Sequence, residues 1–194
     1  MYKIDAVGIA CPMPVIMTKK KLDEIESGKV EIIADNDICV QNLIKFAKSN
    51  GYEYDWEELE EDRFRIIILK DGNESKDRSD GEGDFTIAIG SNLYGSGDEK
   101  LGEILMRSFI YTVSETEPLP KKIVFYNSGV YLTTESSDVL DDLENMEKEG
   151  VEIISCGTCL DFYGLKDKLK VGSISNMYDI YEAIRNAGRN MVIG

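Results

Sequence analysis

The sequence contains no histidine among its 194 residues. Without an imidazole, the chain cannot build a Ser-His-Asp or Cys-His catalytic group, a histidine metal site or an imidazole acid–base catalyst. Any reactive cysteine in this chain must therefore be activated by another group.

Positive charge is also scarce. The 22 Lys and Arg residues are outnumbered by 37 Asp and Glu residues, which gives a formal net charge of −15. Such a surface repels phosphate backbones and anionic lipid headgroups, so we expect no nucleic-acid partner and no membrane partner. No apolar run approaches the length of a membrane span, and the opening residues MYKIDAVG do not resemble a signal peptide. We therefore expect a cytoplasmic protein.

The four cysteines are too few and too clustered for a disulfide framework. Thiol chemistry, metal binding and plain burial remain as their roles. Cys39 falls early in a predicted helix, beside its apolar stripe, which favours a buried structural role. The other three cysteines, Cys11, Cys156 and Cys159, follow predicted strands.

A segment without large apolar residues divides the chain. Residues 71–84, DGNESKDRSDGEGD, are rich in Gly, Ser and Asp, which is typical of a flexible linker. A long exposed hairpin loop inside one domain is the alternative, although structureless loops of this length are uncommon. The pattern predicts a small domain over residues 1–70 and a second domain over residues 85–194.

Both domains are predicted to be of the α/β class. In the first, the order strand, helix, strand, helix, strand, strand predicts a two-layer βαβαββ sandwich with both helices on one face of a mixed sheet. Its expected elements cover residues 2–7, 12–27, 29–35, 38–49, 52–62 and 63–70.

The second domain alternates strands with helices, which predicts a three-layer fold with a parallel sheet covered on both faces. The expected strands are 84–90, 121–127, 151–156, 170–175 and 190–194, and the expected helices are 98–115, 133–150 and 177–187. The acidic helix at 133–150 is expected to begin on a capping Ser or Thr.

The stretch VGIACPMPVIMTKKKL places Cys11 between the first strand and the first helix. Pro12 suits the first helical position because an N–H has no partner there, so we expect Cys11 to be the N-cap. Unpaired N–H groups and the positive end of the helix dipole would then lower the pKa of its thiol, and Pro14 would stiffen the first turn. A small buried cysteine without reactivity is the alternative.

The motif GIACPMPVIMTKK resembles the signature of TusA/SirA-like sulfur-carrier domains, in which a Cys-Pro-x-Pro motif follows the first strand. The resemblance covers residues 1–70. It implies that Cys11 carries sulfur as a persulfide and that Pro12 and Pro14 shape its site.

A second thiol site is predicted after the strand VEIIS, where CGTC opens a turn that contains Gly157. Ligands gather at the carboxyl ends of strands in an open α/β sheet, so Cys156 and Cys159 are candidate site residues, and Asn127, at the end of the preceding strand, is expected to border them. Cys156 is nearer the strand end, and Cys159, nearer the following helix, is the candidate for the better-activated thiolate.

The C-x-x-C pair itself is compatible with several kinds of chemistry. Such a pair can attack, be resolved by its neighbour and cycle. Thioredoxin-like exchange is one alternative, and a zinc ion shared by two subunits is another, although zinc needs two further ligands and the chain has no histidine. We expect no metal and no cofactor.

The strand IVFYNSGV, the acidic helix and GVEIISCGTCLDFYGL come in an order that resembles the DsrE-like family of sulfur-handling proteins, over residues 85–194. The whole chain resembles the YedF family, described as sulfurtransferase-like proteins associated with selenium metabolism. These resemblances imply a reactive cysteine at Cys156 or Cys159 and a homo-oligomer assembled through the DsrE-like domain. They leave open which cysteine is primary and whether the element is sulfur or selenium.

The glycine-rich stretch GSNLYGSGDEKLG, residues 90–102, departs from the phosphate-binding patterns that it suggests. A Ser-Gly pair replaces the Lys-Ser/Thr of a P-loop, and Lys100 stands where G-x-G-x-x-G needs its third glycine. Asp98 and its acidic neighbour would repel a phosphate at the start of a helix. We expect a turn at the edge of the cysteine pocket and no nucleotide.

Two functions from different classes are compatible with these features. The first is a sulfur or selenium relay, in which Cys11 takes a persulfide-type atom from a donor such as a cysteine desulfurase, and the CGTC pair accepts it, reduces it or passes it to a downstream acceptor. The second is a non-enzymatic regulatory or redox-sensing protein whose cysteines are sensors or structural. The sequence leaves the direction of transfer open.

Overall fold

The computed structural model describes residues 1–10, 12–60, 62–71 and 85–194. The chain separates into two units, Met1–Ser79 and Asp80–Gly194, and each unit has a hydrophobic core of its own. The predicted linker at 71–84 lies almost wholly outside the described residues, so its boundaries and its flexibility stay predictions. Within the described ranges, no helix is long and apolar enough to cross a membrane.

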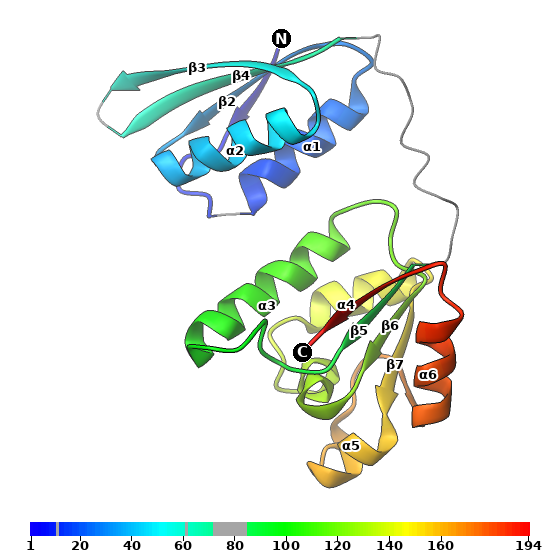
Figure 1. The fold of residues 1–194 in the computed structure, drawn as a ribbon. Helices are drawn as coiled ribbons and strands as arrows, with labels where there is room; N and C mark the ends of the chain where they lie inside the picture. Colours follow the sequence, from blue (N-terminus) through cyan, green and yellow to red (C-terminus); the bar gives the residue numbers. More distant parts are fainter. Residues whose placement is uncertain (11, 61, 72–84) are drawn as a thin grey trace. The chain divides into compact units, whose positions relative to one another are not determined.

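The N-terminal unit is a two-layer α/β sandwich, as predicted (Figure 1). Its elements are β1 (Tyr2–Asp5), α1 (Met13–Glu24), β2 (Gly28–Ala34), α2 (Asp37–Ser49), β3 (Glu53–Glu60) and β4 (Arg63–Lys70). The strand order is β1-β2-β4-β3, with β1 parallel to β2 and the other pairs antiparallel. Both helices cover the same face, where the fully buried side chains include Val30, Ile32, Ile66, Ile68, Leu22 and Leu43.

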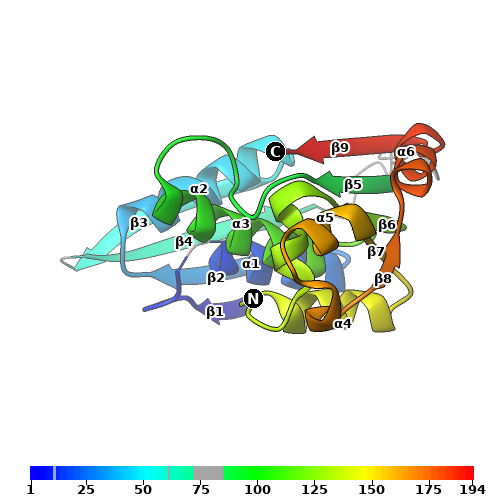
Figure 2. The same cartoon turned by 90° about the horizontal axis from the view of Figure 1, so that it is seen from below.

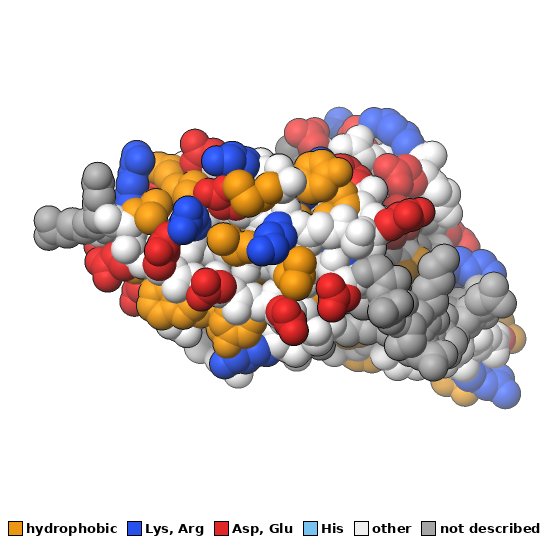
Figure 3. All heavy atoms as spheres, turned by 90° about the horizontal axis from the view of Figure 1, so that it is seen from above, with side chains coloured by type: hydrophobic (Ala, Val, Ile, Leu, Met, Phe, Trp, Pro, Cys, Tyr) orange, Lys and Arg blue, Asp and Glu red, His pale blue; other side chains and the backbone are white. Residues whose placement is uncertain are grey.

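The opposite face of this sheet carries no helix in the described part of the unit. Hydrophobic side chains lie there among charges of both signs (Figure 3). Ile33 and Ile67 alternate with the buried isoleucines and stay only half-buried. The buried Glu31 carboxylate lies 3.3 Å from the Nζ atom of Lys3, so this face is mixed rather than apolar.

Helix α1, Met13–Glu24, begins later and ends earlier than the predicted helix at 12–27. Pro12 takes the capping position and Pro14 lies in the first turn, while the N–H of Ile16 bonds to the Pro12 carbonyl over 3.2 Å. The prediction that Cys11 caps this helix, with Pro12 as its first residue, is therefore wrong by one position. The helix stops at Glu24 rather than at residue 27 because Ile25 has an extended backbone.

The C-terminal unit is a three-layer α/β fold with an all-parallel sheet, as predicted (Figures 1 and 2). Its elements are β5 (Phe85–Ile89), α3 (Glu99–Ser114), β6 (Lys122–Phe125), the 3₁₀-helix η1 (Asn127–Thr133), α4 (Leu140–Lys148), β7 (Glu152–Cys156), α5 (Gly157–Phe162), the 3₁₀-turn η2 (Lys166–Lys168), β8 (Ser173–Ser175), α6 (Met177–Arg185) and β9 (Arg189–Ile193). The strand order is β8-β7-β6-β5-β9. Helices α3 and α4 cover one face, and α6 covers the other.

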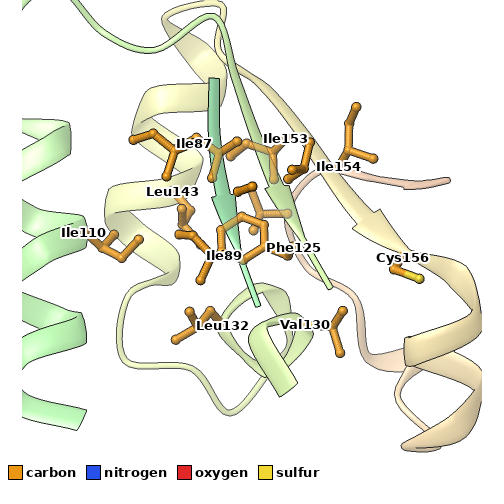
Figure 4. Packing of buried hydrophobic residues seen from close by; sticks show 14 of the residues in the cluster. Ile87, Ile89, Ile110, Phe125, Val130, Leu132, Leu143, Ile153, Ile154 and Cys156 are labelled. Atoms are coloured by element: carbon orange, nitrogen blue, oxygen red, sulfur yellow. The ribbon is translucent and has the colours of Figure 1, made fainter. Parts of the chain in front are cut away.

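The central strands of this sheet are nearly continuous apolar runs because both of their faces are covered. Figure 4 shows Ile87, Ile89, Phe125 and Ile153 packed together between the strands and the helical layer. All four side chains are buried.

Helix α4 is much shorter than the predicted helix at 133–150 and has no Ser or Thr cap. It begins at Leu140 after Val139. The hydroxyl groups expected to cap it are engaged elsewhere: Thr133 Oγ1 donates to the Val130 carbonyl, and Thr134 Oγ1 donates to the Tyr131 carbonyl, both over 2.9 Å. These threonines therefore close η1 and do not start α4.

The separate cores predict separate unfolding. Trp56, the only tryptophan, lies in β3 and packs against Phe64, so its fluorescence reports on the N-terminal unit. Leu43→Ala empties a fully buried position in that unit and should lower its unfolding free energy by about 2–5 kcal/mol. The matched variant Leu143→Ala, in the other core, should leave the urea transition of Trp56 in place. An equal shift in both variants would show that the units unfold together.

Candidate functional site

The candidate site lies at the carboxyl ends of β6 and β7, which pair in parallel. Their register places Phe125 opposite Ser155, so the residues that follow leave the sheet at the same edge. There η1 begins at Asn127, and α5 begins at Gly157, directly after Cys156. Two segments far apart in the sequence therefore meet at one edge.

Two glycines let these turns pass close to neighbouring backbone. A Cβ atom at Gly129 would lie 2.3 Å from the carbonyl oxygen of Ile89. Any residue larger than glycine would therefore clash there unless the backbone moved. A Cβ atom at Gly157 would lie 3.0 Å from Ile174 Cγ2 and 3.2 Å from the Ser175 carbonyl oxygen. Gly157 thus allows the first turn of α5 to pack against β8.

Helix α5 holds the cysteine pair in its first turn. Cys156 takes the capping position, and Cys159 is the third helical residue. The Cys156 side chain makes no capping hydrogen bond, and the Cys156 thiol is close enough to raise the pKa of Cys159. Cys156 is only 2% exposed and lies at the edge of the hydrophobic core (Figure 4), whereas Cys159 is half-buried.

A backbone N–H from the neighbouring strand end faces the second cysteine. The N–H of Asn127 donates a hydrogen bond to Cys159 Sγ over 3.1 Å. Asn127 has a φ of +48°, a left-handed conformation that asparagine adopts more readily than most residues. Tyr163 Oη donates to Asn127 Oδ1 over 3.0 Å, and the Tyr131 ring lies 5.0 Å from that of Tyr163. These contacts hold the N–H toward the sulfur.

Sequence reasoning missed the two tyrosines. Tyr163 carried a signal, because it lies in LDFYGL four residues after Cys159, the spacing that places two side chains on one side of a helical turn. Tyr131 carried no comparable signal, since it reaches the site from η1.

Burial raises the pKa of the Cys159 thiol. The hydrogen bond from Cys156 raises this pKa further, the Asn127 N–H lowers it, and the charge of a Cys156 thiolate raises it again. The raised pKa keeps Cys159 protonated at neutral pH in the resting protein. Desolvation thus outweighs the favourable N–H at Cys159, and which of the two cysteines is the better-activated thiolate stays a prediction.

The first cysteine motif belongs to the other unit. Cys11 itself lies outside the described residues, so its role as a carrier stays a prediction. The loop before it is anchored by Gly8, whose N–H donates to Asp35 Oδ2 over 2.6 Å. This N–H lowers the pKa of Asp35, with a smaller contribution from the side chain of Asn36. Cys39 is buried in the core of this unit, as predicted.

The glycine-rich loop at 90–102 ends in a helix start that is already satisfied. Asp98 caps α3, and its Oδ1 atom accepts a hydrogen bond from the Leu101 N–H over 3.0 Å. A carboxylate thus occupies the place that a phosphate would need. Within the described residues, no three Cys, Asp or Glu side chains are grouped so that they could hold a metal ion.

A groove of about 470 Å³ lies between α6 and the sheet, and neither cysteine lines it. Its charged groups are paired with protein partners: Lys122 Nζ lies 2.8 Å from Glu152 Oε2, and Asn176 Nδ2 donates to Asp179 Oδ2 over 2.9 Å. The thiols therefore define the candidate site, and the groove does not.

The environment of Cys159 predicts its reactivity with iodoacetamide. Because its pKa is raised, alkylation of Cys159 should be slower at neutral pH than that of a solvent-exposed thiol and should accelerate only at alkaline pH. Cys156→Ser removes the thiol and the charge that raise this pKa, so the pH–rate profile of Cys159 should move to lower pH. Peptide mapping gives both profiles. The control Cys39→Ser, in the other unit, should leave the profile in place, and an unmoved profile in Cys156→Ser would contradict the assignment.

The chain is similar to known proteins over its N-terminal third. A protein of Methanocaldococcus jannaschii, provisionally named a sulfur carrier protein, is 42% identical over 71 residues, which are 36% of this chain and 95% of the relative. The sulfur carrier protein TusA of Allochromatium vinosum is 35% identical over 69 residues, which are 35% of this chain and 91% of the relative.

The C-terminal unit has its own similarities. The crystal structure of the ychN protein from E. coli superposes with a TM-score of 0.43 at 15% identity, over 56% of this chain and 98% of that one. The family model described as sulfurtransferase TusA matches residues 2–70, and that of the DsrE/DsrF-like family matches residues 94–193. The chain therefore belongs to the DsrE/DsrF-like family through residues 94–193 and to the TusA family through residues 2–70.

Proposed function

We propose that this chain is a sulfur carrier with two thiol stations, Cys11 in the N-terminal unit and Cys159 in the C-terminal unit. The proposal is supported by the presence of two thiol sites in one chain. A TusA-family unit includes the motif ACPMP around Cys11, and the second unit holds a thiol pair at the edge of a parallel sheet, with a backbone N–H directed at one sulfur.

The transfer between the stations needs only thiol chemistry. The thiolate of Cys159 attacks the terminal sulfur of a Cys11 persulfide, an S–S bond forms at Cys159, and the S–S bond at Cys11 breaks. Cys11 leaves as a thiolate and takes up a proton, while Cys159 has lost one to solvent. No net oxidation or reduction occurs in this step.

Cys159 is the receiving thiol of the pair. Cys156 is 2% exposed, so a persulfide on another protein or unit cannot reach it without displacing core residues. Cys159 is half-buried and accepts the Asn127 N–H, which stabilises a thiolate as it forms. Its raised pKa is compatible with this role, because the thiolate of a weakly acidic thiol is the stronger nucleophile.

The partners follow from this chemistry. We infer a persulfide donor such as a cysteine desulfurase and a downstream acceptor, and the net charge of −15 favours partners with basic docking surfaces. A role in selenium metabolism, which the sequence resemblance supports, and a cytoplasmic location, which we expect from the sequence, are part of the same proposal.

Loading experiments test the proposal. The protein is incubated with a cysteine desulfurase and cysteine, and the modified cysteines are mapped by mass spectrometry without reductant. We expect sulfur on Cys11, and loss of desulfurase-dependent uptake by about tenfold or more in Cys11→Ser. Cys39→Ser, which alters a buried thiol of the same unit, should load like the wild type. Uptake by Cys11→Ser at the wild-type rate would overturn the carrier role of Cys11. The same assay with selenocysteine in place of cysteine as the desulfurase substrate tests whether the protein also carries selenium.

We also propose that the C-terminal unit assembles with a second copy of itself through the start of α3. Leu101, Ile104 and Leu105 lie on one side of this helix at i, i+3 and i+4, and Tyr94 is tied beside them through a 3.1 Å hydrogen bond from its N–H to the Gly102 carbonyl. These four side chains are between 39% and 53% exposed, and an apolar patch of this kind marks an interaction surface.

Charge substitution tests this interface. The double variant Leu101→Glu, Ile104→Glu buries two carboxylates in the proposed contact, which costs several kcal/mol, so it should sediment as a monomer where the wild type sediments as a dimer or larger. Leu59→Glu, an equally exposed position on β3 of the other unit, should keep the wild-type assembly. A monomeric wild type, or a double variant that still assembles, would refute this interface.

A further inference from the structure

The two cysteines at the start of α5 differ in exposure, and this difference has a chemical consequence. The first, Cys156, is the last residue of β7 and belongs to the hydrophobic core, whereas the second, Cys159, is half-buried and lies at the site edge. A donor can therefore reach the Cys159 thiol but not the buried Cys156 thiol. Because Cys156 is not needed to receive sulfur, its position indicates a different role.

The geometry places the buried thiol within reach of the loaded one. The two residues are the cap and the third residue of one helical turn, and the Cys156 thiol is close enough to raise the pKa of Cys159. Side chains three residues apart on a helix have Cβ atoms about 5–6 Å apart, and a disulfide needs about 3.8 Å. A small adjustment of a single turn at the helix end closes this gap.

We propose that Cys156 resolves the persulfide of Cys159 and releases its terminal sulfur as hydrosulfide, an activity that deepens the carrier function proposed above and rests on it. The Cys156 thiolate attacks Cys159 Sγ, the S–S bond to the terminal sulfur breaks, and that sulfur leaves with the bonding pair as hydrosulfide. A disulfide between Cys156 and Cys159 forms in the same step.

The electrons balance within the pair. The sulfane sulfur gains two electrons, and the two thiols lose them in forming the disulfide. The pair returns to its free state by exchange with an external dithiol reductant. The disulfide spans one helical turn at the protein edge, where Cys159 is accessible, so such a reductant can attack it at Cys159.

The surroundings favour release over a further transfer inward. Cys156 belongs to the buried hydrophobic cluster, so a Cys156 persulfide would place an additional sulfur inside the core, where no acceptor could reach it. Hydrosulfide is small and leaves from the half-buried side of Cys159. The Asn127 N–H, bonded to Cys159 Sγ, holds that sulfur in place during the attack.

A single-turnover experiment on the full chain tests this step. Glutathione persulfide is the probe, because it loads Cys159 without Cys11, and all proteins carry Cys11→Ser so that sulfur on Cys11 does not contribute. In the background with both α5 cysteines we expect hydrosulfide in an amount equal to the protein and a Cys156–Cys159 disulfide, both measured without reductant. Adding Cys156→Ser should stop the release by about tenfold or more and leave a persulfide on Cys159.

The variants separate the possible failures. Serine is a favourable capping residue, so Cys156→Ser should keep α5 folded, and the circular dichroism spectrum checks this. If the Cys156→Ser protein holds a persulfide on Cys159 but releases hydrosulfide as fast as its parent, the resolving step is refuted and the carrier role stands. If Cys159 takes up no sulfur in either protein, the receiving role of Cys159 fails, and the resolving step fails with it. Cys159→Ser should neither load nor release.

Discussion

The parallel pairing of β6 with β7 is the constraint on which the candidate site depends. Parallel strands end at one edge, so this pairing carries Asn127 and Cys156 to the same place. The hydrogen bond from the Asn127 N–H to Cys159 Sγ then joins segments 32 residues apart. Gly129 maintains the approach, because only a residue without Cβ fits against the Ile89 carbonyl. A register slip between the two strands would separate the N–H from the sulfur.

The absence of histidine makes the backbone the main electrostatic partner of the thiols. At Cys159 a single N–H opposes desolvation and a neighbouring thiol, and the resulting pKa is raised. At the loop before Cys11 the balance is reversed, since the exposed Asp35 carboxylate accepts the Gly8 N–H and its pKa is lowered. The same donor type thus keeps one group charged and leaves the other protonated, because desolvation is the largest effect on the pKa of Cys159 but is smaller than the hydrogen bonds to Asp35.

Sequence patterns predicted the elements whose cause is local. The strands of the C-terminal sheet were predicted because continuous apolar runs need burial on both faces. The burial of Cys39 was predicted because this residue lies beside the apolar stripe of a helix. The start of α4 was mispredicted because Thr133 and Thr134 bond within η1, and Thr133 also meets Ser155 across the core over 2.9 Å. The contact of Tyr163 with Asn127 depends on a positive φ and on sheet pairing, which no local pattern encodes.

The order of exposure within the C-x-x-C pair follows from the direction of the chain. A central strand of a covered sheet is buried along its length, so its last residue, Cys156, still belongs to the core. Only after the chain has turned at Gly157 can a side chain reach the edge, and Cys159 is the first cysteine to do so. In this chain the motif therefore exposes its second thiol and keeps its first thiol in the core. In the proposed mechanism, this order of exposure makes Cys159 the receiving thiol and Cys156 the resolving thiol.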